Sequence, residues 1–92
     1  MVYIFLAEGF EEIEALCPLD ILRRAGTDVK TVAIGGGEYV TGSHGICVKA
    51  DMTESDFSDR SPEMIVLPGG LPGATNLDNS SVVERSLFDS LM

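Results

Sequence analysis

AEGFEEIEALCP, residues 7–18, joins a short apolar strand to a helix through a tight turn at Gly9. The run at residues 2–7 consists of strand-forming apolar residues, a pattern typical of a parallel strand covered on both faces. The helix is predicted over residues 10–25, with acidic residues in its first turn, and Gly26 is suited to a left-handed C-terminal cap. Strand, glycine turn and helix in this order predict the first unit of an α/β fold.

Glu14 carries a carboxylate on the side of this helix that is predicted to face the sheet. At about 100° per residue, its stripe contains Cys17, Pro18, Ile21 and Ala25, with Leu22 beside it. Glu12 and Arg23 fall on the opposite, solvated side. A carboxyl desolvated by such a stripe, at the sheet edge where α/β folds bind ligands, is expected to stay protonated. Glu14 is therefore the first candidate functional residue; the alternative is a structural glutamate that snorkels or pairs with a basic residue.

The rest of the chain predicts a doubly wound α/β fold with a mostly parallel sheet. The expected elements are strands at 28–34 and 63–67, a hairpin at 38–41 and 46–50 that adds an antiparallel excursion to the sheet, a polar loop with one helical turn at 51–59, and a helix from Ser80 or Ser81. This order is the first half of such a sheet and leaves a parallel strand with an unpaired edge. We therefore expect residues 1–92 to be the N-terminal half of a single domain, which residues from elsewhere complete.

Charge and composition exclude several classes of protein. A net charge of −9 argues against nucleic acid or an anionic membrane as a partner. The two cysteines make a poor disulfide framework, and no signal peptide precedes the first strand. No apolar run approaches the ~18 residues that a membrane-spanning helix needs. These features predict a cytoplasmic protein with reduced thiols.

A glycine-rich turn, LPGGLPGA at residues 67–74, follows the last predicted strand. Gly69 and Gly70 would let bare backbone N–H groups face a pocket, which an oxyanion or an anionic ligand requires. The alternative is an ordinary strand-to-helix loop. The stretch is not a phosphate P-loop, because the Gly-Lys-Ser/Thr end of that motif is absent, and it is not a dinucleotide-binding fingerprint either.

The remaining reactive side chains give weaker signals. His44 lies in a glycine-flanked loop and is interpreted as a plain turn residue. Neither cysteine has a neighbouring ligand at metal-site spacing, so no metal or other cofactor is predicted. Cys17 lies one turn beyond Glu14 but has no cationic neighbour on that stripe, which disfavours it as a nucleophile.

The combined motifs resemble the ThiJ/PfpI superfamily, in its Parkinson-associated deglycase-like branch. The matching blocks, in the family's order, are residues 2–15 with Pro18 and Asp20, residues 23–26, residues 42–46, and residues 65–70 with Gly73 and Ala74. The resemblance covers essentially the whole chain. It corresponds to the N-terminal half of a family member.

This resemblance implies a flavodoxin-like homodimer with a reactive cysteine at a sharp strand-to-helix turn. Glu14 matches the family glutamate that stays protonated and donates a hydrogen bond to that cysteine. Gly69 and Gly70 match the glycine turn that forms one side of the oxyanion site. The nucleophilic cysteine and the histidine that follows it are not in this chain, and neither Cys17 nor Cys47 matches them. The chain alone is therefore expected to be inert.

Completed by the missing half, the site is expected to act as a cysteine-dependent glyoxalase or deglycase on small reactive aldehydes or their adducts. Peptidase-like activity also occurs in the family. Alternatives are a redox-sensing chaperone or stress protein without catalysis, a protein associated with thiazole monophosphate biosynthesis, and a bare fragment of an assembly. The family dimer uses the first helix, on which Ile13 and Leu16 lie away from the Glu14 stripe. These two residues are the predicted dimer contacts; the alternative is that they are simply exposed.

Overall fold

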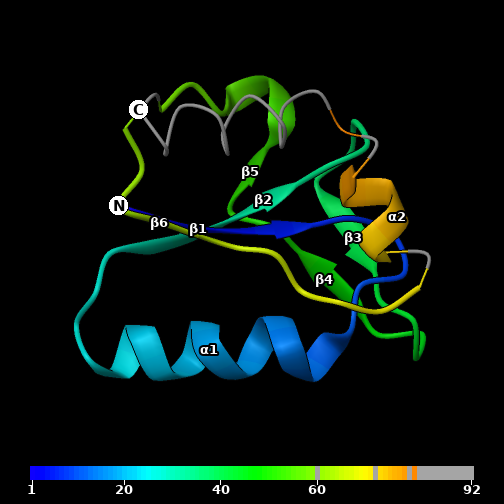
Figure 1. The fold of residues 1–92 in the computed structure, drawn as a ribbon, viewed down its shortest axis with the longest axis horizontal. Helices are drawn as coiled ribbons and strands as arrows, with labels where there is room; N and C mark the ends of the chain where they lie inside the picture. The colour runs from blue at the N-terminus through cyan, green and yellow to red at the C-terminus, as the bar shows by residue number, and fades with distance from the viewer. Residues whose placement is uncertain (60, 72, 79, 81–92) are drawn as a thin grey trace.

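A four-stranded parallel sheet with the strand order β5-β2-β1-β6 forms the centre of the fold (Figure 1). The computed structural model describes residues 1–59, 61–71, 73–78 and 80. The strands are β1 (Val2–Leu6), β2 (Val29–Ala33), β5 (Met52–Thr53) and β6 (Met64–Val66). Every pairing in this sheet is parallel, so the predicted α/β, flavodoxin-like class is confirmed.

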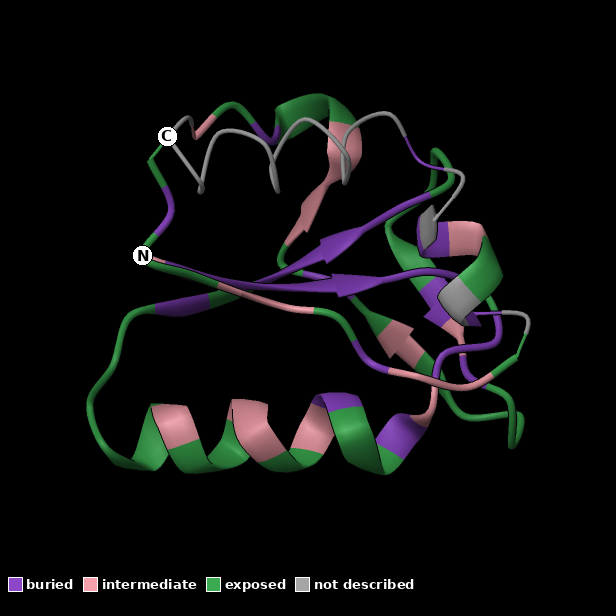
Figure 2. Ribbon diagram, in the orientation of Figure 1, coloured by how far each residue is buried: buried purple, intermediate pink, exposed green. Residues whose placement is uncertain are grey.

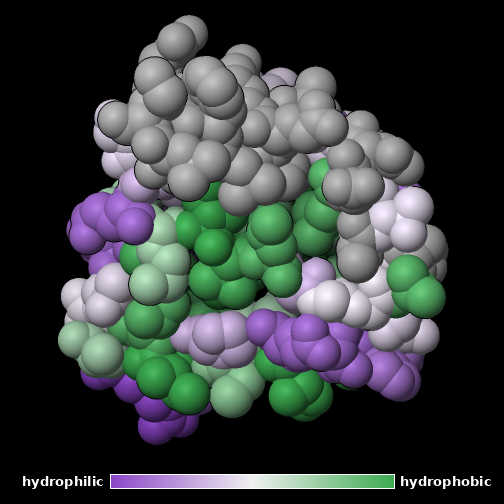
Figure 3. All heavy atoms as spheres, viewed as in Figure 1, coloured by the Kyte–Doolittle hydropathy of each residue, from purple (hydrophilic) through white to green (hydrophobic). Residues whose placement is uncertain are grey.

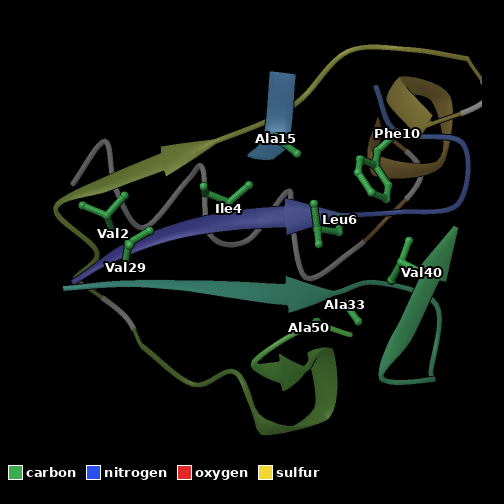
Figure 4. Packing of buried hydrophobic residues seen from close by; sticks show 9 residues of the cluster. All are labelled: Val2, Ile4, Leu6, Phe10, Ala15, Val29, Ala33, Val40 and Ala50. Atoms are coloured by element: carbon green, nitrogen blue, oxygen red, sulfur yellow. The ribbon is translucent and has the colours of Figure 1, made fainter. Parts of the chain in front are cut away.

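Strand β1 lies between β2 and β6, and all five of its side chains are buried. Alternate residues of a strand point to opposite faces, and β1 accordingly contributes to two apolar clusters. Val2, Ile4 and Leu6 pack on the α1 side, with Ala15 of the helix lying over them (Figure 4). Tyr3 and Phe5 pack on the other side. There both rings meet the ring of Phe57 edge-on, at centroid distances of 4.8 and 5.3 Å.

Helix α1 (Glu12–Arg24) runs along one face of the sheet and ends as predicted. Gly26 has a left-handed φ of 80°. Its N–H donates to Arg23 O at 3.1 Å, and the Thr27 N–H donates to Leu22 O at 3.0 Å. These two bonds form a Schellman cap, which satisfies carbonyls at the end of the helix. Pro18 lies inside the helix without ending it.

The predicted core face of α1 is wrong. Glu14, Cys17, Ile21 and Ala25 are exposed, whereas Ala15, Leu19 and Leu22 face the sheet. Much of the side of α1 that lies away from the sheet is exposed (Figure 2). Glu12, expected in solvent, is only 2% exposed. The cause is that apolar residues surround most of this helix, so periodicity alone does not select the side that packs against the sheet.

The predicted hairpin is present but does not join the main sheet. Strands β3 (Tyr39–Thr41) and β4 (Cys47–Lys49) form a separate antiparallel pair. Val40 packs into the core cluster on the α1 side, and the Gly9 N–H donates to Thr41 O at 2.9 Å. The hairpin therefore covers the carboxyl end of β1 instead of extending the sheet.

Two elements were not predicted. The loop at 51–59 contains β5, paired with β2, followed by the 3-10 turn η1 (Glu54–Asp56), so only the helical turn was expected. The glycine turn leads into the short helix α2 (Gly73–Asp78). The helix predicted from Ser80 or Ser81 falls on residues 81–92, outside the described residues.

In the part of the chain that the structure describes, no helix is both long enough and apolar enough to cross a lipid bilayer.

Candidate functional site

The candidate site lies beyond the carboxyl ends of β1 and β6. The chain leaves β1 toward β2 on one side and later returns to β6 on the other side. Ligands of open α/β sheets bind at such a switch point, outside the carboxyl ends of the strands. The turn at Gly9 after β1 and the turn at Gly69 after β6 meet there (Figure 1).

The structure brings the predicted residues Glu14 and Gly69 together. The Gly69 N–H donates to Glu14 Oε1 at 2.8 Å, across 55 residues of sequence. In the other direction, the Glu11 N–H donates to Gly69 O at 2.9 Å. Gly69 is therefore bonded through both of its backbone groups to the first turn of α1. Glu14 itself is exposed in this structure, so the described residues do not supply the desolvation expected for it.

Gly70, the third predicted residue, lies where only glycine fits. Its φ is 92°, and a Cβ there would lie 2.7 Å from the Glu11 nitrogen and 2.9 Å from Gly9 O. Gly73 is packed as tightly as Gly70, since a Cβ added to Gly73 would lie 2.6 Å from the backbone of Phe10. The Gly73 N–H also donates to Gly9 O at 3.2 Å. The two turns thus pack backbone against backbone.

Glu8, next to the same turn, links it to the hairpin and to α2. Its Oε1 accepts from the Thr41 N–H at 3.1 Å, and its carbonyl accepts from Asn76 Nδ2 at 2.8 Å. The Ser43 N–H reaches the Phe10 carbonyl at 2.8 Å. The hairpin and α2, both distant in sequence, therefore fix the turn that begins α1.

Glu12 lies next to the site and was not predicted from the sequence to have a role there. Its Oε1 lies 2.8 Å from His44 Nδ1, and its Oε2 accepts from the N–H groups of His44 at 2.8 Å and Ile46 at 3.3 Å. Burial raises the pKa of Glu12, but the His44 ring and the surrounding backbone N–H groups outweigh it and hold the pKa at about 2. The carboxylate in turn raises the pKa of His44, with a smaller contribution from Glu11.

Glu12 and His44 therefore form a structural contact between the start of α1 and the hairpin loop, which we call the latch. The polar atoms of Glu11, Glu12 and His44 lie within 4.8 Å of one another, a spacing that would suit a metal ion. The Glu12 oxygens, however, already accept bonds from the hairpin loop, and Glu11 Oε1 caps the helix by accepting from the Ile13 N–H at 2.7 Å. His44 is therefore more than the plain turn residue expected from sequence. The glycines that flank His44 were the sequence feature that could have pointed to this role.

Neither cysteine is placed as a nucleophile by the described residues. Cys17 and Cys47 are both free and exposed. Cys17 lies on the outer side of α1, and Cys47 lies in the hairpin strand β4. The chemistry that the site offers is thus a carboxyl held by a backbone N–H beside a glycine turn.

Known proteins are similar to this chain in sequence and fold. Residues 1–89 match the DJ-1/PfpI family. A Parkinson disease protein 7 homolog from Danio rerio is 38% identical over 94% of this chain and 46% of its own length. For the deglycase PfpI of Pyrococcus furiosus the identity is 33%, over 96% of this chain and 54% of that protein.

A solved structure is similar over the same extent. It is the crystal structure of a cysteine-to-alanine mutant of a DJ-1 superfamily protein from Salmonella typhimurium, with 39% identity and a TM-score of 0.92. The match covers 97% of this chain and 48% of the Salmonella chain. The chain therefore spans about half the length of these relatives.

Proposed function

Because the chain belongs to the DJ-1/PfpI family, we propose that it supplies the N-terminal half of a cysteine-dependent glyoxalase or deglycase-like site. The substrates are small reactive aldehydes or their adducts. A relative that carries the name deglycase, with 33% identity, supports this class of reaction. The proposal covers residues 1–92 as one half of a domain whose other half carries the cysteine.

The hydrogen bond between Gly69 N–H and Glu14 Oε1, at 2.8 Å, is the observation that carries the proposal. It holds a carboxyl at the switch point of the sheet beside a glycine turn, which is the combination that the proposed thiolate reaction uses. In the proposed reaction the thiolate attacks the aldehyde carbon, a C–S bond forms, and the carbonyl electron pair moves onto oxygen. Glu14 donates a hydrogen bond to the thiolate, and the glycine turn supports the developing negative charge.

The outer strand β6 supports the proposal that a complementary half binds here. In the part of the chain that the structure describes, β6 pairs with β1 and with no other strand. Met64 and Leu67 are 52% and 41% exposed, and apolar atoms extend across the middle of this face (Figure 3). A parallel strand added at this edge would pair the open backbone groups of β6 and would bring further residues to the same carboxyl end.

Two further features complete the proposal. The exposed side chain of Ile13 on α1, with half-buried Leu16 beside it, supports a homodimer through this helix. The free thiols of Cys17 and Cys47 fit a reducing, cytoplasmic location.

Methylglyoxal turnover by the full-length protein tests the proposed function. Glu14→Leu is expected to lower kcat/KM by about 100-fold or more, the usual scale for a lost hydrogen-bond donor to a reacting group. Glu38→Leu is the matched control, because Glu38 is exposed and its side chain has no hydrogen bond in the described structure. Turnover retained in Glu14→Leu would contradict the role of Glu14. Peroxide-dependent holdase activity without any turnover would instead support the redox-sensing alternative.

Complementation tests the division into halves. Residues 1–92 alone are expected to be inert, and addition of the complementary polypeptide is expected to restore turnover. Activity of this chain by itself would refute the proposal.

A further inference from the structure

The N–H of Gly69 already has an acceptor. A backbone N–H carries one hydrogen, so a strong bond to one acceptor leaves little for a second. At 2.8 Å from Glu14 Oε1, the Gly69 N–H is engaged in this way. Of the two glycines in the turn, Gly69 is therefore not free to receive a negatively charged oxygen.

Among the described residues, Glu14 is held through one of its two oxygens. Oε1 accepts from Gly69, and within the described residues no group forms a hydrogen bond with Oε2. A neutral carboxyl has one carbonyl oxygen, which accepts, and one hydroxyl oxygen, which donates. An N–H donor favours the carbonyl oxygen, so a proton on Glu14 belongs on Oε2.

We propose that Gly69 is a positioning residue, whose N–H holds Oε1 of Glu14 and thereby makes Oε2 the oxygen that donates a hydrogen bond to a reacting group. The inference rests on the proposed function of Glu14. It separates the two glycines: Gly69 orients the acid, and Gly70 is the remaining N–H of the turn for a negatively charged atom.

The surroundings of Gly69 favour this role. Its carbonyl accepts from the Glu11 N–H at 2.9 Å, so the residue is anchored to the helix that carries Glu14. There is also no space for a side chain, since a Cβ at Gly69 would lie 2.7 Å from Glu14 Oε1. Gly69 has no positive φ, so its requirement for glycine comes from this close approach.

The Gly69 amide resonance in ¹H–¹⁵N NMR tests the contact independently of activity. The amide proton is expected to lie downfield and to move upfield in Glu14→Leu. In Glu14→Gln it is expected to stay downfield, because the side chain keeps an acceptor. A Gly69 amide shift that is indifferent to Glu14→Leu would overturn the proposal.

Turnover of methylglyoxal by the full-length protein tests the division between the two oxygens. Glu14→Gln keeps an acceptor at the position of Oε1 and a donor at that of Oε2, so it should retain activity within about 10-fold. Gly69→Ala moves the carboxyl and should lower kcat by about 10-fold or more. Gly37→Ala is the matched control, because nothing lies within 4 Å of its added Cβ.

A double-mutant cycle separates positioning from general structural damage. In the Glu14→Leu background, Gly69→Ala should have no further effect on kcat, because the group that it positions is gone. Additive losses would overturn the proposal. Full activity in Glu14→Leu, together with the expected amide shifts, would instead refute the proposed function and the role of Oε2, while the Gly69 contact itself would stand.

Discussion

The carboxylate of Glu12, 2% exposed, lies 2.8 Å from Nδ1 of His44, whose side chain is two-thirds exposed at 67%. One partner is thus inside the fold and the other is open to solvent. Because the loop that carries His44 also binds the turn at the start of α1, this pair couples the hairpin to the site. A change in the protonation of Glu12 or His44 should therefore change the free energy of unfolding of the whole fold.

The latch should make stability depend on pH in two opposite directions. The pKa of Glu12, lowered from 4.5 to about 2, gives a contribution that is present above about pH 4.5 and is lost as the pH falls toward 2. The pKa of His44, raised above 6.5, gives a contribution that is present below that pH and is lost as the pH rises through the raised value. The contribution of the pair should therefore be greatest between about pH 4.5 and 6.5.

Urea unfolding of the wild type and Glu12→Gln across this pH range measures the effect. The difference in unfolding free energy between the two should shrink at both ends of the range. Glu38→Gln, at an exposed glutamate, should give a constant difference. Parallel pH profiles for wild type and Glu12→Gln would show that the latch does not form.

Thr31→Val should destabilise the fold by about 1–3 kcal/mol, the usual cost of leaving partly buried polar groups without partners. The Thr31 hydroxyl donates to Asp51 Oδ2 at 3.1 Å and accepts from the Asp51 N–H at 2.9 Å. Arg23 binds the same carboxylate at 2.7 Å, so the network ties α1 and β2 to the residue before β5. Chemical denaturation measures the loss, and the exposed Thr27→Val is the control. Equal midpoints for the two variants would contradict this role.

Gly73→Ala should cost about 1–3 kcal/mol through overpacking. Its Cβ would lie 2.6 Å from the backbone nitrogen of Phe10, and backbone yields less readily than a side chain. Gly37→Ala, with an open environment, should change the unfolding free energy by no more than about 0.5 kcal/mol. If both variants unfold at the same urea concentration, the close packing of the two turns is wrong.

Ile13→Arg should shift the assembled protein toward monomer in analytical ultracentrifugation. Ile13 is 71% exposed, and a charge at the centre of an apolar contact would have to be desolvated without a partner. Ile21→Arg provides the matched control on the same helix, where Ile21 is 59% exposed. An unchanged mass for Ile13→Arg, or an equal shift for both variants, would exclude this surface of α1 as the dimer contact.

The sequence was a good guide wherever local pattern determines structure. The apolar run of β1, the glycine cap at Gly26 and the hairpin around residues 42–45 are all confirmed, because each depends on neighbouring residues alone. The contact between Glu14 and Gly69 also agrees with the expectation that both lie at the carboxyl edge of the sheet.

The errors have long-range causes. The core face of α1 depends on which side meets the sheet, and the helix carries apolar residues around most of its circumference. Glu12 is buried because residues 43–46 supply donors from 31 to 34 positions away, which no local pattern reveals. Strand β5 is two residues long and is defined by its pairing with β2.

The sequence separations in the site also determine when it forms. Glu14 and Gly69 are 55 residues apart, and Glu8 and Asn76 are 68 apart. Each contact requires closure of a long loop, whose entropic cost comes before any stabilisation. An early folding intermediate with only β1, α1 and β2 would therefore contain the Glu14 carboxyl without its partner. During synthesis on the ribosome, this carboxyl would find its orienting N–H only after the turn at Gly69 has left the exit tunnel, so site assembly is among the last steps of folding.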